Sequence, residues 1–418
     1  MRRTRHARKR IPMSDPDFRR RGLLLGAASA PFAATAFSTT ASAADSRDQI
    51  DLSRRYPFYG PGPQAGIATP PQRHAIFMTF DLTTTNPRDL QLLLARWSAS
   101  IAQMMKGEPV GQVDPQRAHA TALDTGEALD LGPASLTVTV GFGPGLFDDR
   151  LGLQACRPAA LRPLTRLTGD ALHPNLTGGD LSLQACADDP QVAYHAIRVL
   201  ARLARSTGAA ATRWAVTGFG RASAGRGQAT PRNLMGFRDG TRNIREPEEM
   251  DRFVWADDPT WGPGGSYQVA RKIRMVIESW DTDRVDDQNA VFGRFKVSGA
   301  PLGGTGEFDQ PDFAAQGPDG PVIPANSHIR LAAHENNDGL RILRRSYNYT
   351  DGINTVGMLD AGLLFIAYQN DPSAFETLQA RLGAADALNE YITHIGSAVF
   401  YTPPAVAEGS YIGAQMFT

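Results

Sequence analysis

Two stretches of this sequence decide its fold: Leu181-Ser-Leu-Gln-Ala-Cys-Ala-Asp-Asp-Pro190 and Leu363-Leu-Phe-Ile-Ala-Tyr-Gln-Asn-Asp-Pro372. In each, a short apolar run of the kind found in buried strands leads into Asp-Pro and then into an amphipathic helical pattern. An aspartate can cap the start of a helix, and a proline suits its first turn. The spacing between the two stretches is close to half the length of the chain beyond residue 43. This repetition indicates a duplicated unit.

The segments around the first stretch complete one such unit. The sequence predicts strands at residues 75–82, 136–142, 181–187 and 211–219, and helices at residues 87–105 and 191–205. With an insertion in its middle, this order is that of the ferredoxin-like split βαβ unit. In the second half, a helix is predicted at residues 373–382 and further strands at residues 267–279, 341–349 and 397–401.

We therefore expect an α+β protein with two tandem ferredoxin-like domains, each an antiparallel sheet with flanking helices, similar to a dimeric α/β barrel. The N-terminal domain is expected at residues 74–225 and the C-terminal domain at residues 226–418. Residues 44–73 are rich in proline and glycine and are expected to form an extended lead-in. The Gly/Pro-rich loop at residues 299–324 is long for a connection, so we expect it to line a site or contact a partner.

Composition and charge exclude several classes of protein. Of the 418 residues, 42% are hydrophobic and 21% are charged, which is ordinary for a globular chain. The 43 basic and 43 acidic residues balance, but residues 1–43 hold nine of the basic and two of the acidic ones. The mildly acidic remainder has no electrostatic footprint for nucleic acid. No segment after residue 43 has the length and apolarity of a transmembrane span.

The basic N-terminus has the three parts of an export signal. Arg19-Arg20-Arg21 precede an apolar run at residues 23–37, and Ala41-Ser42-Ala43 forms a small-x-small cleavage site. The arginines before Gly22-Leu-Leu24 are typical of the twin-arginine route, and an ordinary secretory signal is the alternative. We expect residues 1–43 to be a twin-arginine signal peptide and the mature protein to be periplasmic or extracellular. That route exports folded proteins, commonly with a cofactor already bound, so it favours a prosthetic group.

The two cysteines, Cys156 and Cys186, have no metal-binding spacing. An oxidising compartment would allow them to pair, and two free thiols are the alternative. A glycine-rich stretch at residues 141–145 follows a predicted strand, but Leu146 stands where a dinucleotide-binding loop needs glycine. The sequence also lacks a Walker loop, a G-x-S-x-G elbow and an H-E-x-x-H motif. Nicotinamide, ATP and zinc chemistry therefore have no signature in this chain.

Three segments of the second half carry residue types that belong together chemically. They are Gly236-Phe-Arg-Asp239-Gly240-Thr241, Ile323-Pro-Ala-Asn-Ser-His328-Ile-Arg330-Leu-Ala332 and Arg341-Ile-Leu-Arg344-Arg345-Ser-Tyr-Asn-Tyr349. Histidine is the usual proximal ligand of haem iron in peroxidases and globins. On the opposite face of a haem, an acid could move a proton between the oxygens of a peroxide, and a guanidinium could stabilise the developing charge. The three segments together predict one peroxidase pocket.

At these segments the chain resembles the dye-decolorizing (DyP-type) peroxidase family, in particular its twin-arginine-exported branch that includes the deferrochelatase/peroxidases. The matching motifs are G-x-x-D-G at residues 236–240, SHIRLA at 327–332, LRRSYNY at 343–349, TVTVGFGPGLF at 137–147, GDLSLQACADD at 179–189 and LDAGLLFIAYQ at 359–369. The resemblance extends over the chain from about residue 55 onward. It implies tandem ferredoxin-like domains, with haem b bound in the C-terminal one.

The same resemblance implies a role for each matched residue. His328 matches the proximal ligand of the haem iron, Asp239 the distal acid and Arg344 the distal arginine. The positions that match the border of the haem are Gly240, Thr241 and Arg242.

Two points stay open. Related sequences often read Asn-Pro shortly after the ligand stretch, where this chain has Ala333-His334-Glu335-Asn336. His334 is therefore a second candidate ligand, although the flanking match centres on His328. The carboxylate that orients a proximal imidazole is open between Asp312, Asp319 and Asp360.

The resemblance implies a haem b peroxidase that uses hydrogen peroxide to oxidise an organic electron donor through an oxoferryl intermediate. A deferrochelatase, which releases iron from haem and leaves the porphyrin intact, is the alternative, with haem as its substrate. An exported haem-binding protein without catalysis is an alternative of another class. Homodimers are common in the family, so a homodimer is the oligomeric state it suggests.

Overall fold

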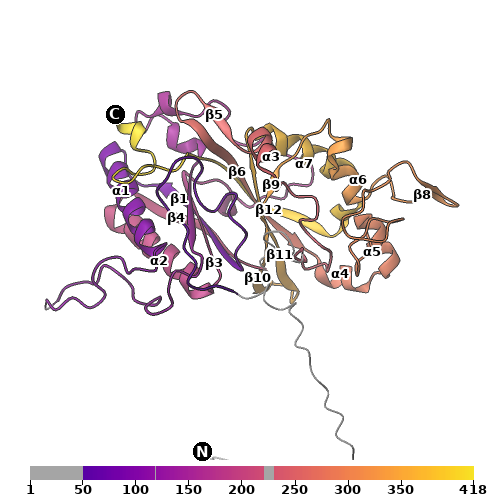
Figure 1. Cartoon of the computed structure of the whole chain (residues 1–418), viewed down its shortest axis with the longest axis horizontal. Helices are drawn as coiled ribbons and strands as arrows, with labels where there is room; N and C mark the ends of the chain where they lie inside the picture. The colour runs from indigo at the N-terminus through magenta and orange to yellow at the C-terminus, as the bar shows by residue number, and fades with distance from the viewer. Residues whose placement is uncertain (1–49, 118, 221–229) are drawn as a thin grey trace, which may run out of the picture. The chain divides into compact units, whose positions relative to one another are not determined.

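The computed structural model describes residues 50–117, 119–220 and 230–418 (Figure 1). The predicted signal peptide at residues 1–43 and most of the predicted boundary between the domains lie outside these ranges. Within them, no helix is long and apolar enough to cross a membrane.

The N-terminal half folds as the sequence predicts, with element ends within two residues of the expected ones. Its elements are β1 (His74–Leu82), α1 (Pro87–Met104), β2 (Thr137–Phe142), β3 (Leu181–Ala187), α2 (Pro190–Thr207) and β4 (Ala210–Phe219). The strands pair antiparallel in the order β2-β3-β1-β4, which is the ferredoxin-like order. Asp189 caps α2 by accepting the backbone N–H groups of Gln191 and Val192, as expected.

The C-terminal half repeats this strand order with additions. Its strands are β5 (Ala256–Asp258), β6 (Gly262–Met275), β7 (Gln316–Gly317), β8 (Gly320–Pro321), β9 (Leu343–Arg344), β10 (Tyr347–Ile353), β11 (Leu359–Gln369) and β12 (Ile392–Thr402). Its helices are α3 (Pro247–Phe253), α4 (Ile277–Thr282), α5 (Val285–Phe292), α6 (His328–Ala332) and α7 (Ser373–Ala385). The order β10-β11-β6-β12 corresponds to that of the first half.

All three strands predicted in the C-terminal half differ from the observed ones, and the one expected at residues 397–401 is β12, which already begins at Ile392. The strand expected at residues 267–279 ends at Met275, because the chain turns there into α4. The strand expected at residues 341–349 is divided into β9 and β10. Both parts keep one register against β11, with Arg344 opposite Ala367 and Tyr347 opposite Leu364, so the interruption does not move the strand.

The two sheets join at both edges. Tyr401 of β12 lies opposite Phe142 of β2, and Tyr349 of β10 lies opposite Gly218 of β4. With the pairing of β6 and β11, eight strands of the described chain close into a ring, as expected for a fold like a dimeric α/β barrel. Glycine is needed at the second junction, because a Cβ atom on Gly218 would lie 2.6 Å from Cβ of Tyr347.

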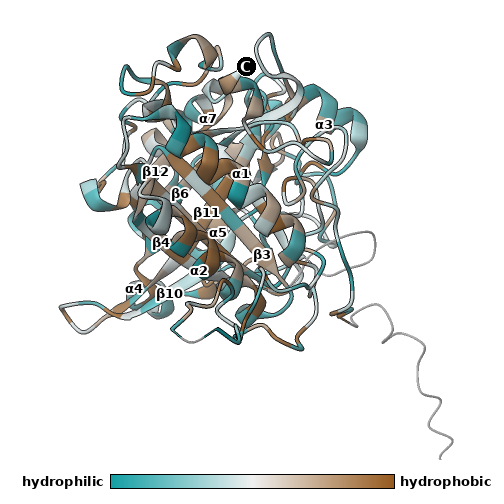
Figure 2. Ribbon diagram, turned by 90° about the vertical axis from the view of Figure 1, so that its left-hand side faces the viewer, coloured by the Kyte–Doolittle hydropathy of each residue, from teal (hydrophilic) through white to brown (hydrophobic). Residues whose placement is uncertain are grey.

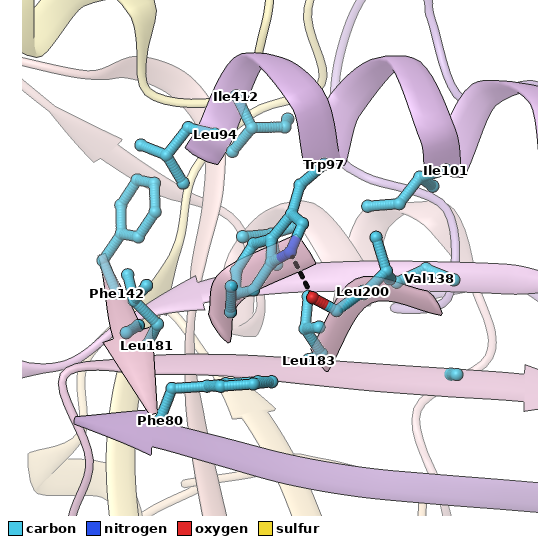
Figure 3. Packing of buried hydrophobic residues seen from close by; sticks show 14 of the residues in the cluster. Phe80, Leu94, Trp97, Ile101, Val138, Phe142, Leu181, Leu183, Leu200 and Ile412 are labelled. Atoms are coloured by element: carbon cyan, nitrogen blue, oxygen red, sulfur yellow. Dashed lines mark hydrogen bonds between the residues drawn. The ribbon is translucent and has the colours of Figure 1, made fainter. Parts of the chain in front are cut away.

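Helices cover the outside of the ring, and side chains from both sheets fill its inside. In the N-terminal half α1 and α2 pack on the sheet, and Trp97 donates its indole N–H to the carbonyl of Leu200 at 2.9 Å (Figure 3). Inside the ring, Phe77, Leu364 and Phe400 belong to one buried cluster. Figure 2 shows the contrast between the largely hydrophobic strand β3, all of whose residues are buried, and the hydrophilic helix α3, which buries none.

The two cysteines do not form a disulfide. Cys186 is buried in β3, whereas Cys156 is partly exposed in a 3₁₀ turn. Of the two alternatives that the sequence leaves open, the structure therefore has two free thiols.

Candidate active site

A cavity of about 250 Å³ lies on the outer face of the C-terminal sheet. Alternate residues of β6 and β11 face it from the sheet, while α6 and α7 contribute the opposite wall. Apolar side chains make much of its lining, among them Ile273, Met275, Phe292, Leu363, Phe365 and Phe375. Such a lining suits a mostly apolar ligand.

His328, the first residue of α6, faces this cavity from one wall. Its Nδ1 atom lies 2.6 Å from Oδ2 of Asp386, and its side chain is 30% exposed. Burial alone would lower the pKa of His328, but the Asp386 carboxylate outweighs this effect and the pKa is raised. Because the contact uses Nδ1, the Nε2 atom, which has no hydrogen-bond partner in the described chain, is left as the ligating atom.

Asp386 corrects the sequence prediction for the carboxylate that orients His328. Asp312 accepts backbone N–H groups of its own loop instead, and none of the three predicted aspartates contacts the imidazole in the described chain. Asp386 is held in turn by the backbone N–H of Leu388, 2.9 Å from its Oδ1 atom. It lies 58 residues from His328 in the sequence and belongs to no motif, so only the fold brings the two together.

Asp239 and Arg344 face the same cavity as a pair. Nη1 of Arg344 lies 2.5 Å from Oδ1 of Asp239. The side-chain amide of Asn243 donates to the carbonyl of Arg344 at 2.7 Å and accepts its backbone N–H at 2.9 Å. The loop that carries Asp239 is thereby fixed to strand β9. The three residues that the sequence predicts to act together therefore share one cavity.

The residues predicted to border the haem also line this cavity, namely Gly240, Thr241 and Arg242. Arg242 makes a salt bridge of 2.6 Å with Glu335, and its Nη2 atom lies 3.4 Å from Nδ1 of His334. His334 lines the cavity as well, so the structure places both histidines there. Burial lowers the pKa of His334, with Arg242 acting in the same direction. Only His328 has a short contact with a buried carboxylate, which supports it as the ligand.

Sequence reasoning missed several charged residues of the cavity. The predicted arginines are joined there by Arg271 and Arg294, which lie in no motif, and by Arg341, which begins one of the three quoted segments but was given no role. Burial, followed by repulsion from Arg242, lowers the pKa of Arg294 to about 10. His394, which no motif marks, is buried and also lines the cavity. An excess of guanidinium groups suits a ligand with carboxylates.

A second cavity, of about 370 Å³, adjoins the first where Asp239 and Arg344 lie. Its walls include residues 67–72 of the predicted lead-in, the end of β4 and the start of β10. The buried hydroxyl of Ser346, which has no partner in the described chain, is part of this wall. The second cavity gives a small molecule a place beside the Asp239–Arg344 pair.

Both halves of the chain match family models. A Dyp-type peroxidase N-terminal model matches residues 64–220, and a Dyp-type peroxidase C-terminal model matches residues 230–407. A deferrochelatase of Yersinia pseudotuberculosis is 40% identical over 394 residues, which cover 90% of this chain and 89% of the relative. A deferrochelatase of Escherichia coli is 37% identical over 378 residues, covering 87% and 88%.

Solved structures have the same fold. An oxyferrous complex of DtpA from Streptomyces lividans matches with a TM-score of 0.80 at 39% identity, covering 88% of this chain and 98% of that chain. A DyP-type peroxidase from Streptomyces coelicolor matches with a TM-score of 0.79 at 40% identity, covering 87% and 97%.

Proposed function

The chain belongs to the Dyp-type peroxidase family, and on that premise we propose that it is a haem b peroxidase that uses hydrogen peroxide to oxidise an organic electron donor. One observation carries this proposal. A single cavity with largely apolar walls is lined by the His328 imidazole, which contacts the buried Asp386 carboxylate. The same cavity is lined by the Asp239–Arg344 pair.

The residues present fit a haem. His328 would hold the iron through Nε2, with Asp386 keeping the ring oriented, and the arginines would pair with the propionates. When bound, the haem supplies an iron atom to which peroxide can coordinate and the electrons that cleave the O–O bond. The protein holds the haem, orients the peroxide and moves the proton of the peroxide.

Proton transfer falls to Asp239. Its carboxylate accepts the proton from one oxygen of hydrogen peroxide and returns it to the other, which then leaves as water. Arg344 stabilises the negative charge that develops on the departing oxygen. The second cavity supplies the approach for peroxide to this pair.

The ligand assignment is tested by His328→Ala, with His334→Ala as the matched control. We expect the purified His328→Ala protein to lose its axial imidazole, seen as a changed Soret band, whereas His334→Ala keeps the wild-type spectrum. If His328→Ala retains a wild-type Soret band and axial ligation, the assignment is wrong.

Deferrochelatase activity is the second candidate, and the names of the relatives with 37–40% identity favour it. The same cavity would then hold haem as substrate. Anaerobic incubation of the haem-loaded protein distinguishes the two functions, because fluorescence of metal-free protoporphyrin appears only if iron leaves the ring. Family membership makes the chain an enzyme in either case, rather than a passive haem carrier.

We further propose that residues 1–43 direct export by the twin-arginine route to the periplasm or beyond, and that the protein forms a homodimer. The sequence of that segment supports the first proposal. Export is tested by detecting the mature protein outside the cytoplasm, and we expect Arg20→Lys and Arg21→Lys together to abolish it. Light scattering of the purified protein tests the dimer.

A further inference from the structure

The long loop at residues 299–324 places one glutamate against the segment that carries Asp239. Glu307 lies in a tight turn, which Asp309 stabilises by accepting two of its backbone N–H groups. The side chain of Glu307 is only 11% exposed. A carboxylate buried to this extent needs partners that neutralise it.

Among the described residues, the side-chain partners of Glu307 all lie in residues 230–242. Its Oε2 atom lies 3.0 Å from Nη1 of Arg238. Its Oε1 atom accepts the hydroxyl of Thr241 at 3.0 Å and also the hydroxyl of Thr230. One carboxylate therefore fixes three points of the segment, which is more than a single surface ion pair achieves.

The three contacts determine where Asp239 points. Arg238 precedes Asp239, and Thr241 follows it after Gly240, whose φ of +124° lies in a region that glycine adopts readily. Both flanking side chains are tied to Glu307, whereas the carboxyl of Asp239 reaches Arg344. Holding both neighbours of Asp239 leaves its side chain little freedom to leave the arginine.

The backbone of the loop is held by Arg294, and Gly299 of the loop lies close to Arg238 of the segment. Arg294 donates from Nη1 to the carbonyl of Glu307 at 3.0 Å and to that of Gly299 at 2.6 Å. A Cβ atom on Gly299 would lie 2.5 Å from Cδ of Arg238, so the loop approaches that side chain as closely as glycine allows. Arg294 itself lines the main cavity.

We propose that Glu307 is a positioning residue for the distal acid: by anchoring Arg238 and Thr241, it holds the Asp239 carboxyl against Arg344. This role rests on the proposed function, in which Asp239 moves the proton of peroxide. Glu307 acts through its neighbours and does not itself touch the reacting atoms. A displacement of about 1 Å in a catalytic group can slow a reaction about 100-fold.

The test compares Glu307→Ala and Glu307→Gln with the wild-type haem-loaded protein. We expect Glu307→Ala to react with peroxide about 10–100-fold more slowly in stopped-flow measurements. The rate of Glu307→Gln should lie between those of Glu307→Ala and the wild type. Its amide oxygen can still accept the hydroxyls of Thr230 and Thr241, but it has no negative charge to pair with Arg238. The Soret band should stay unchanged, since His328 and Asp386 are not involved.

Hydrogen–deuterium exchange gives a readout that does not depend on activity. We expect faster amide exchange at residues 230–242 in Glu307→Ala, with and without haem, and unchanged exchange in α6. Glu376→Ala is the matched control, because Glu376 is 12% exposed and is bound to an arginine and a threonine, Arg162 and Thr165. Its partners lie far in sequence from Asp239, so it should alter neither measurement.

Each combination of rate and exchange results supports or refutes the positioning role of Glu307. Slower reaction together with faster exchange at residues 230–242 supports the positioning role. A wild-type peroxide rate in Glu307→Ala overturns it, whether or not exchange changes, because the contact would then be structural only. If Glu307→Ala does not fold, Glu307→Gln takes its place. A loss of at least threefold in its rate with peroxide then supports the positioning role, and a smaller loss refutes it. A wild-type protein that does not react with peroxide refutes the proposed function instead, and the exchange data still report whether Glu307 fixes the segment.

Discussion

The two halves of this molecule share one strand order but use the outer face of the sheet differently. In the N-terminal half α1 and α2, each of 18 residues, cover the sheet, and Phe80, Trp97 and Leu183 fill the space beneath them (Figure 3). In the C-terminal half the corresponding helix α7 has 13 residues, and α6 has only five. There the space between helices and sheet is the main cavity.

The difference shows how a duplicated fold gains a site. Filling the helix–sheet layer with apolar side chains stabilises the first copy, because burial of apolar area is the main favourable term in folding. The second copy omits part of that packing and places ionisable groups in the space. Buried charges there are paired, as in His328–Asp386 and in Arg271–Asp170, whose aspartate comes from the N-terminal half. The first half therefore keeps a filled helix–sheet layer, and the second half keeps a cavity lined by ionisable groups.

The largest effect is expected at the acid of the C-terminal cavity. Asp239→Asn should lower the rate of reaction with peroxide about 10²–10⁴-fold, because the amide cannot accept and return the proton. Stopped-flow absorbance of the haem-loaded protein measures this rate. Asp257→Asn, an exposed position of β5, is the control and should react like the wild type. A wild-type rate in Asp239→Asn would remove the assigned role.

The next effect contrasts packing in the two halves. Trp97→Ala should lower the free energy of unfolding by about 3–5 kcal/mol, since Trp97 is fully buried and makes a hydrogen bond. Leu378→Ala should cost about 2 kcal/mol or less, because Leu378 already borders a cavity. Urea unfolding of the haem-free protein measures both. Equal losses would mean that the two layers are packed alike.

A smaller effect is expected from the residue that orients His328. Asp386→Asn keeps the size of the side chain but removes the charge that favours a strongly basic imidazole, so haem affinity should fall about 10–100-fold. Transfer of haem to an apo-acceptor protein measures the loss. Asp312→Asn changes one of the three positions that the sequence left open, and it should transfer haem at the wild-type rate. Faster haem transfer from Asp312→Asn with a wild-type rate in Asp386→Asn would contradict the structure.

The last effect concerns pH. Burial, then repulsion from Arg271, lowers the pKa of His394 from 6.5 to about 4, while Asp170 opposes the shift. Between these two values the unfolded state binds a proton that the folded state does not. The stability that neutral His394 contributes is therefore complete above pH 6.5 and declines as pH falls toward 4, by up to about 1.4 kcal/mol per pH unit. In His394→Gln, the free energy of unfolding measured in urea should change less between pH 6.5 and 4 than in the wild type. The same pH dependence in both proteins would refute the lowered pKa of His394.

Much of the fold could be predicted because its signals are local. The Asp189-Pro190 start of α2 and the apolar runs of β3 and β11 depend on neighbouring residues only. The site residues Asp239, His328 and Arg344 were accessible because each lies in a motif, and the structure brings them to one cavity. Their roles remain predictions for the experiments above.

The rest depends on contacts between distant segments. Asp386 reaches His328, and Glu307 reaches Arg238, only because strands and loops far apart in sequence fold together. No periodicity or spacing marks such residues, which are separated by 58 and 69 positions. The end of β6 at Met275 was missed for a related reason, since the apolar residues that follow continue into α4 instead of the strand.

The absorption spectrum of the purified protein, before and after one equivalent of hydrogen peroxide, tests the central claim most directly. We expect a Soret band of histidine-ligated haem that changes within seconds of adding peroxide and returns when an organic donor is supplied. A protein that shows no Soret band even after haem is added, or whose spectrum peroxide leaves unchanged, would contradict it.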